Sequence, residues 1–185
     1  MKPPLPFPFA LNIGTDIVHI PRITRLITRP GGYLARFTRR ILTEQEQQDF
    51  HARFSLSPKL PLHSTPNFTP DSKPKDHLRG PKNENTYITP DMARWLAGRF
   101  AAKEAGRKAA VGGAGAAGWK DVVVRAGDRR PDVVLFDRGD GESEGENEVE
   151  TQTETKMETE RQGRVGRLSI SHDGEYVVAT VLAAG

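Results

Sequence analysis

The sequence contains no cysteine, few aromatic residues and no long apolar segment. Without cysteine the chain has no disulfide bonds, no thiolate metal ligands and no cysteine nucleophile, and its redox compartment stays open. No apolar run approaches the roughly 18 residues needed to cross a bilayer, so we expect a soluble protein without a membrane partner. Aromatic residues make up 7% of the chain, which leaves little material for the stacking surfaces of single-stranded nucleic-acid binding.

Charge is unevenly distributed along the 185 residues, although the formal net charge is only +3. Lys and Arg are concentrated in residues 22–40 and 94–108, whereas Glu is concentrated in 142–160. A basic surface can bind nucleic acid, anionic lipid or an acidic protein that carries a phosphorylated cofactor. Composition alone therefore leaves a basic nucleic-acid-binding module as an alternative.

The length of the chain is typical of a single domain. The proline-rich start predicts a flexible leader over residues 1–10, and it lacks the arginines of a transit peptide. Residues 55–88 are rich in proline, residues 139–163 are rich in Glu, Gly and Thr, and neither has much apolar periodicity. Both segments predict disordered insertions within one domain over residues 11–185.

Local patterns predict an α+β fold. Residues 11–18 are apolar and β-branched, which predicts a buried strand. Two strands are expected near 119–126 and 130–137, and a hairpin closes the chain around residues 172–175. Helices are expected over 21–27, 33–40, 43–53 (with Thr43 and Glu46 as a capping box) and from Pro90 to the glycines at 112. A small antiparallel sheet packed on one long helix accommodates all of these elements.

Asp16 is anomalous because it interrupts the apolar pattern of the first strand. A carboxylate that leaves water is costly unless it has a partner, so Asp16 requires a metal ion, a cation or backbone donors. The local sequence does not choose between a metal site and a structural salt bridge.

Charged residues with helical spacing lie in the longest predicted helix. Arg99 and Lys103, and likewise Glu104 and Lys108, are four residues apart, so each pair shares one face. Exposed ion pairs explain this spacing as well as a functional site does. Apolar neighbours such as Trp95 indicate that part of the charged face lines a cleft.

His172 follows a strand pattern and directly precedes a predicted turn. Strand ends often carry functional side chains, although a solvent-exposed turn residue is an equally ordinary explanation. The glycine-rich residues 112–118 lack the spacing of a phosphate-binding loop and predict a flexible end to the long helix.

Three segments in order resemble one family: IGTDIVHIPRI at 13–23, RWLAGRFAAKEAGRKAA at 94–110 and LSISHDGEYVVATVL at 168–182. Together they resemble the holo-acyl-carrier-protein synthase group of 4'-phosphopantetheinyl transferases, and RFTRRILTEQE at 36–46 is similar to the family segment between its first strand and long helix. The resemblance implies the α+β fold of these enzymes. It also implies transfer of 4'-phosphopantetheine from coenzyme A to a serine of apo acyl carrier protein, which releases adenosine 3',5'-bisphosphate.

The resemblance further implies that Asp16 and Glu104 bind Mg²⁺ together with the coenzyme A pyrophosphate and water. Mg²⁺ prefers about six hard oxygen ligands, often one or two carboxylates plus substrate phosphates. Lys108 would neutralise charge on the leaving phosphate. Asp16, Glu104 and Lys108 are thus the expected catalytic residues, with Glu104 or a water on the metal accepting the serine proton.

Four residues are expected to contact coenzyme A by the same resemblance: Arg99, Lys103, Lys108 and His172. An acidic carrier protein would bind the basic segment, because arginine is well suited to carboxylates at interfaces. Arg22 and Arg36 match docking positions of the family. The full set of candidate docking residues is Arg22, Arg25, Arg36, Arg39 and Arg40.

The family resemblance implies a homotrimer with active sites between subunits, one subunit supplying the metal carboxylates and its neighbour further cofactor contacts. The two insertions depart from the compact bacterial pattern and indicate a eukaryotic, fungal member, for which a mitochondrial carrier protein is expected. The compartment is therefore mitochondrial or cytoplasmic. A catalytically inactive scaffold for carrier proteins remains an alternative.

Overall fold

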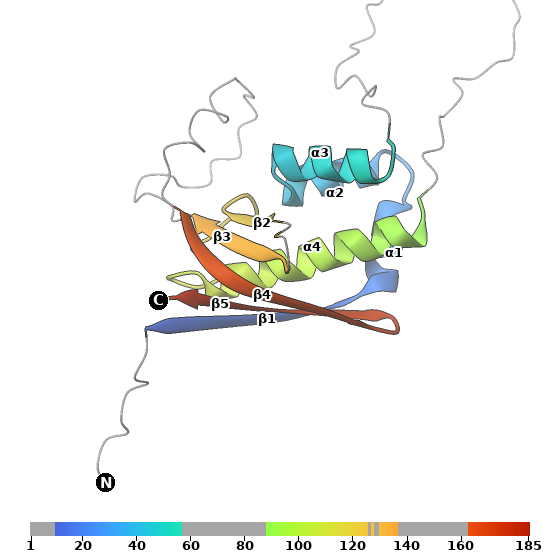
Figure 1. Ribbon diagram of the computed structural model, residues 1–185. Helices are drawn as coiled ribbons and strands as arrows, with labels where there is room; N and C mark the ends of the chain where they lie inside the picture. The colour runs from blue at the N-terminus through green and yellow to red at the C-terminus, as the bar shows by residue number, and fades with distance from the viewer. Residues whose placement is uncertain (1–9, 57–87, 126, 128–129, 137–162) are drawn as a thin grey trace, which may run out of the picture.

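The computed structural model in Figure 1 describes residues 10–56, 88–125, 127, 130–136 and 163–185. The predicted leader (1–10) and insertions (55–88 and 139–163) fall almost entirely outside these ranges. The elements in chain order are β1 (Leu11–His19), α1 (Ile20–Ile27), α2 (Tyr33–Ile41), α3 (Glu44–Arg53), α4 (Pro90–Ala109), β2 (Val122–Arg125), β3 (Asp132–Phe136), β4 (Gly163–Asp173) and β5 (Tyr176–Ala184).

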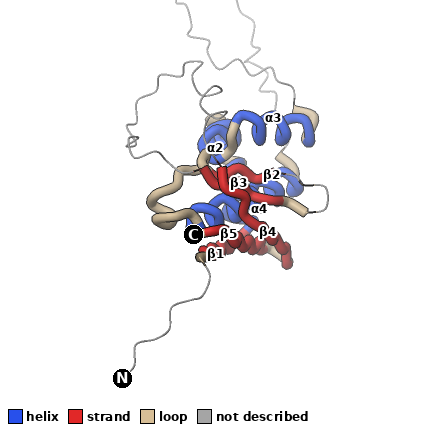
Figure 2. Tube along the Cα trace, turned by 60° about the vertical axis from the view of Figure 1, so that its left-hand side comes forward, coloured by secondary structure: helices blue, strands red, loops and turns tan. Residues whose placement is uncertain are grey.

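The strands form one antiparallel sheet in the order β1-β5-β4-β3-β2. Helix α4 lies across this sheet, and α2 and α3 lie on the other side of α4, so the long helix is central (Figures 1 and 2). The predicted α+β fold, with a small antiparallel sheet on one long helix, is confirmed. None of the described helices has the length and apolar character needed to cross a membrane.

Small residues allow α4 to approach the sheet closely. Ala101, Ala105 and Ala109 are fully buried on α4. On the facing strand, a Cβ at Gly14 would collide with the carbonyl oxygen of Ala105 and lie 2.8 Å from the nitrogen of Ala109. This contact between β1 and the last turns of α4 is too tight for any residue larger than glycine at position 14.

Strand β1 is an edge strand, and the prediction of a buried strand is wrong for one of its faces. Ile13 and Ile17 are 68% and 62% exposed, and they pair with Leu182 and Val178 of β5 on the same outer face. The alternation arises because successive strand side chains point to opposite faces and α4 covers the even-numbered one. An apolar run cannot distinguish these two cases without knowledge of the layer on each side.

The predicted capping box of α3 is confirmed. The Thr43 hydroxyl accepts a hydrogen bond from the backbone N–H of Glu46, and the Glu46 carboxylate accepts one from the N–H of Thr43. Helix α4 begins in the same way, because Thr89 caps the N–H of Met92. Both starts satisfy backbone donors that would otherwise have no helical partner.

Candidate active site

Asp16 contacts the C-terminal part of α4 through Lys108. The Lys108 ammonium donates hydrogen bonds to Oδ1 of Asp16 and to the carbonyl oxygen of Thr15, both at 2.9 Å. The Asp16 side chain is 18% exposed and that of Lys108 is 42% exposed. The partner that the sequence required for Asp16 is therefore a cation at the protein surface.

Glu104 lies one helical turn before Lys108 and forms an ion pair with Arg107. Nη1 of Arg107 is 3.0 Å from Oε1 of Glu104, and both side chains are about one-fifth exposed, at 21% and 19%. The spacing of four residues suggested a pair between Glu104 and Lys108. Instead, each carboxylate of the expected metal site has its own cationic partner.

These two carboxylates fit a Mg²⁺ ion in type and surroundings. Both are hard oxygen donors, and both side chains are partly exposed to solvent. Each also has a cationic partner that compensates its negative charge. In the described part of the chain no group of three or more His, Cys, Asp or Glu side chains has metal-binding geometry. A site with Asp16 and Glu104 therefore offers two protein ligands and leaves the remaining positions to substrate phosphates and water.

Lys103 occupies a different environment from Lys108, and its expected contact with coenzyme A does not fit the structure. Its side chain has no exposure, and its Nζ lies 2.6 Å from Oε2 of Glu46 and donates to the carbonyl oxygen of Trp119 at 3.0 Å. Burial lowers the pKa of Lys103 because desolvation disfavours the ammonium, and Glu46 opposes this effect. Lys103 is an interior residue that joins α4 to α3 and to the loop before β2.

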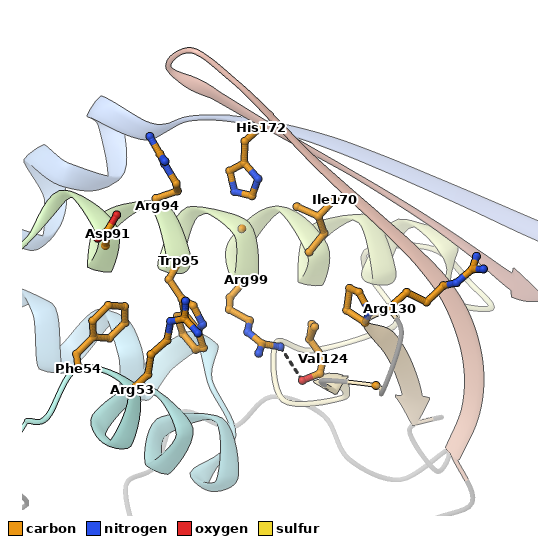
Figure 3. Close-up of a pocket in the computed structure, with 13 residues that line it drawn as sticks. Arg53, Phe54, Asp91, Arg94, Trp95, Arg99, Val124, Arg130, Ile170 and His172 are labelled. Atoms are coloured by element: carbon orange, nitrogen blue, oxygen red, sulfur yellow. Dashed lines mark hydrogen bonds between the residues drawn. The ribbon is translucent and has the colours of Figure 1, made fainter.

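Arg99 and His172, which are both expected to contact coenzyme A, line one cavity. The cavity has a volume of about 1030 Å³. In Figure 3, Arg99 extends from α4 towards β2, where its Nη1 donates to the carbonyl oxygen of Val124 at 2.7 Å, and His172 extends from β4 above the same helix. Arg53, Arg94 and Arg130 also line the cavity, so its charge suits an anionic ligand.

Aromatic rings contact two of the arginines that line this cavity. The Arg99 guanidinium lies 4.7 Å from the ring centroid of Trp95, and Arg53 lies 5.8 Å from that of Phe54. Burial lowers the pKa of Arg99, and nearby Glu46 opposes that shift. Stacked guanidinium groups keep their outer edge available for phosphate oxygens.

The cavity and the Asp16–Lys108 pair lie on different sides of α4. Arg99 and Lys108 are nine residues apart, which rotates them by about 180° around a helix with 3.6 residues per turn. Accordingly, Arg99 contacts Val124 of β2 while Lys108 contacts Asp16 of β1. Neither Asp16, Glu104 nor Lys108 lines the cavity. Within one chain, the expected site residues therefore form two separate groups.

Comparison with known proteins gives the family. Residues 12–181 match the 4'-phosphopantetheinyl transferase superfamily. The chain belongs to this superfamily. The family resemblance read from the three motifs is thereby confirmed, as is the predicted enzyme class.

Two curated relatives align with the transferase along almost its whole length. It is 55% identical over 185 residues to 4'-phosphopantetheinyl transferase B, mitochondrial, of Aspergillus fumigatus, with 98% of each chain covered. It is 32% identical over 179 residues to the holo-[acyl-carrier-protein] synthase of Gloeobacter violaceus, with 96% of this chain and 95% of the relative covered. A crystal structure of holo-[acyl-carrier-protein] synthase from Neisseria meningitidis matches with a TM-score of 0.50 and 25% identity, covering 94% of this chain and 98% of that one.

The predicted docking arginines of the transferase are all exposed on α1 and α2. Arg36 is the most constrained of them, because its guanidinium lies 4.1 Å from the ring centroid of Tyr33 and donates to the carbonyl oxygen of Gly31 at 3.0 Å. The others in this set are Arg22, Arg25, Arg39 and Arg40. They form a basic surface that is free of acidic residues within both helices.

Two residues with structural influence on the transferase site were missed by the sequence analysis. Glu46 was recognised as a cap, but its carboxylate also accepts from the N–H of Val124 at 3.1 Å and binds Lys103. Arg107 was not singled out, although its spacing of three residues from Glu104 permitted an ion pair. Its other hydrogen bonds go to backbone carbonyls, which leave no signal in side-chain patterns.

Proposed function

We propose that the transferase moves the 4'-phosphopantetheine arm of coenzyme A onto a serine of an apo acyl carrier protein, with Asp16, Glu104 and Lys108 as its reacting site. Family membership gives the reaction class. The observation that carries the assignment of the site is the ion pair between Asp16 and Lys108, which lies one helical turn after Glu104 on α4. This pair joins β1 to α4, and Glu104 shares the helix face of Lys108 at a spacing of four residues.

Asp16 and Glu104 are the residues that would hold Mg²⁺. When bound, this ion supplies positive charge that stabilises the pyrophosphate during displacement. In its absence Lys108 and Arg107 neutralise the two carboxylates, which explains how these side chains are tolerated at a partly buried site.

In the proposed reaction the serine oxygen attacks the pantetheine-side phosphorus, and the bond from that phosphorus to the bridging oxygen breaks. Adenosine 3',5'-bisphosphate leaves with the bridging oxygen and the electron pair of the broken bond. Lys108 is the cation proposed to meet this charge, because its side chain is 42% exposed and its ammonium pairs with Asp16. Glu104 is the candidate acceptor of the serine proton.

The arginine-lined cavity is the proposed site for the nucleotide half of coenzyme A. Arg99 and His172 are the family-matched residues there, and Arg53, Arg94 and Arg130 add positive charge. Phosphate groups bind well to several guanidinium groups that are presented in fixed orientations. The side of Trp95 offers an apolar surface beside them.

An active site shared between two copies explains why the expected site residues form two separate groups on α4. We assign the carboxylates of one copy and the cavity of a neighbouring copy to the same coenzyme A, in a homotrimer. Support comes from the outer face of β1 and β5, where Leu11, Ile13, Ile17, Val178 and Leu182 are exposed. Monomeric proteins rarely expose contiguous apolar surface of this kind.

A mitochondrial carrier protein is the proposed physiological substrate. The support is the mitochondrial name of the Aspergillus fumigatus relative, which is 55% identical over 185 residues. Fractionation of cells that express the full chain tests this assignment, and recovery outside mitochondria would contradict it.

The deciding test of the reaction is the intact mass of an apo acyl carrier protein incubated with the transferase, coenzyme A and Mg²⁺, with EDTA as control. A metal-dependent gain of about 340 Da, one phosphopantetheine arm transferred by phosphoryl chemistry, supports the proposal. No gain with several carrier proteins, together with retained binding of coenzyme A, would instead favour an inactive scaffold.

Mixed oligomers test the shared site separately. Glu104→Gln protomers lack a metal carboxylate, and Arg99→Gln protomers carry a defective cavity, so each pure preparation should be impaired. If one site draws on two copies, exchange of subunits between the preparations regenerates some sites with both native halves and restores part of the activity. Activity that stays at the level of the two separate preparations would place both halves in one chain.

A further inference from the structure

Arg107 binds one charged side chain and two backbone carbonyls at the same time. Its Nη1 is 3.0 Å from Oε1 of Glu104, its Nε donates to the carbonyl oxygen of Ala117 at 2.6 Å, and its Nη2 donates to that of Ala114 at 2.8 Å. The guanidinium also lies 4.9 Å from the ring centroid of Trp119. One side chain therefore connects the expected metal carboxylate with the loop that follows α4.

The two halves of this loop are held differently. The later half has further anchors, because Lys103 donates to the carbonyl oxygen of Trp119 and the N–H of Gly118 donates to Asp121. The earlier half, residues 111–116, contains Gly112 and Gly113 with positive φ angles of 81° and 74°. These residues are exposed or half-exposed.

Residues 111–116 make turn hydrogen bonds that are local to the segment and its flank. The N–H of Gly113 donates to Ala110, and the N–H of Ala116 donates to Gly113. The hydrogen bond from Arg107 to Ala114 instead reaches back to α4. Glycine has unusually large conformational freedom, so we expect this half of the loop to depend strongly on Arg107 for its order.

We propose that Arg107 is a positioning residue that couples the loop 111–116 to the charge state of the site at Glu104. Its positive charge stabilises the Glu104 carboxylate, and the fixed geometry of its guanidinium holds the loop. A divalent cation at Glu104 competes with Arg107 for that carboxylate, so binding of the cation weakens the hold on the loop. The coupling rests on the proposed metal-binding role of Glu104, whereas the hold on the loop is independent of it.

Charge and geometry can be separated by two substitutions. Arg107→Lys retains a cation near Glu104 but cannot reach three acceptors with a planar fork. Arg107→Gln loses the charge as well. The side chain is 21% exposed, and circular dichroism with a thermal scan establishes that each full-length variant is folded.

The first measurement is the affinity for Mn²⁺ by electron paramagnetic resonance of the free ion, with and without coenzyme A. Arg107→Gln should bind Mn²⁺ about fivefold more tightly than wild type, because Mn²⁺ no longer competes with Arg107 for Glu104. A change of about fivefold corresponds to the free energy of a partly exposed ion pair. Arg107→Lys should stay close to wild type. A purely structural role for Arg107 predicts no such dependence on charge.

The second measurement is hydrogen–deuterium exchange of the loop in the same proteins. Both variants should exchange faster in residues 111–116, while residues 119–125 keep wild-type protection through Lys103 and Asp121. Saturating Mn²⁺ should accelerate exchange of residues 111–116 in wild type and have little further effect in the variants.

Unchanged exchange of residues 111–116 in both variants would overturn the inference, and so would an Mn²⁺ affinity that is indifferent to the charge at position 107. If wild type binds no Mn²⁺ with or without coenzyme A, the metal assignment of Glu104 fails and the coupling fails with it. If residues 111–116 still exchange faster in both variants, only the metal assignment has failed. The hold of Arg107 on the loop would then stand, because it depends on the two carbonyl contacts alone.

Discussion

Lys108 and Asp16 are 92 residues apart in the sequence, and their side chains meet at 2.9 Å between Nζ and Oδ1. The meeting depends on Gly14, whose missing side chain lets β1 lie directly against Ala105 and Ala109 of α4. The absence of a side chain at position 14 therefore determines whether the Asp16 carboxylate reaches the helix that carries Glu104 and Lys108.

Removal of either expected metal carboxylate should abolish transfer while leaving the fold intact. We expect Asp16→Asn and Glu104→Gln to lower kcat by at least about 100-fold, because each removes charge that acts on the reacting phosphate. The cations left behind are partly exposed, so the free energy of unfolding should change by about 1 kcal/mol or less. The assay is the mass gain of the carrier protein beside a chemical denaturation curve. Near-full activity of either variant would remove that residue from the site.

The two lysines of α4 should separate stability from activity. Lys103→Met leaves the Glu46 carboxylate, which is 2% exposed, without its closest cation, and we expect a loss of about 3–5 kcal/mol in the free energy of unfolding. Lys108→Met removes a side chain that is 42% exposed. It should cost about 1 kcal/mol or less but reduce kcat/KM strongly.

A double-variant cycle tests the interior pair directly. In Glu46→Gln/Lys103→Met neither buried charge remains, so the double variant should be less destabilised than the sum of the two single variants. Denaturant unfolding of the four proteins gives the coupling energy. Simple additivity would contradict a direct interaction between Glu46 and Lys103.

Gly14→Ala should damage both the fold and the active site. The added Cβ would collide with the carbonyl oxygen of Ala105, so we expect a loss of about 1–3 kcal/mol from overpacking, together with a lower kcat as β1 and Asp16 move away from α4. The matched control is Gly115→Ala, where an added Cβ has no atom within 4 Å and should change stability by less than about 0.5 kcal/mol. Thermal unfolding and the transfer assay on both variants make the comparison, and a wild-type profile for Gly14→Ala would refute the role of the close contact.

The sequence predicted those features that depend on local patterns. The bounds of α4, the strands β2 and β3, and the capping of α3 by Thr43 and Glu46 follow from periodicity, turn residues and spacing, and the structure contains them at the expected places. Motif order likewise predicted the family. Partners distant in the chain were beyond such reasoning: the expected role of Lys103 failed because nothing near it in sequence indicates that Glu46, 57 residues earlier, lies against it in the interior.

The division of the site into two groups also could not be read from the sequence. Motif positions placed Arg99, Glu104 and Lys108 in one helical segment and assigned them to one cofactor. The structure adds that Arg99 and Lys108 face different elements, β2 and β1. Proximity in a helical sequence is therefore weak evidence for a common ligand, because residues nine apart lie on opposite sides of the helix.

Charge reversal on the basic surface of α1 and α2 should weaken binding of the carrier protein and leave binding of coenzyme A unchanged. Arg36 is held by Tyr33 and by the carbonyl oxygen of Gly31, so its guanidinium meets an acidic partner with little loss of side-chain freedom. We expect Arg36→Glu to raise the KM for the carrier protein about fivefold, equivalent to about 1 kcal/mol, with an unchanged KM for coenzyme A. Arg125→Glu, an exposed reversal on β2, controls for net charge. Equal effects of the two reversals would mean that long-range charge, and not the surface of α1 and α2, attracts the carrier protein, whereas an effect confined to Arg36 would place the docking contact on that surface.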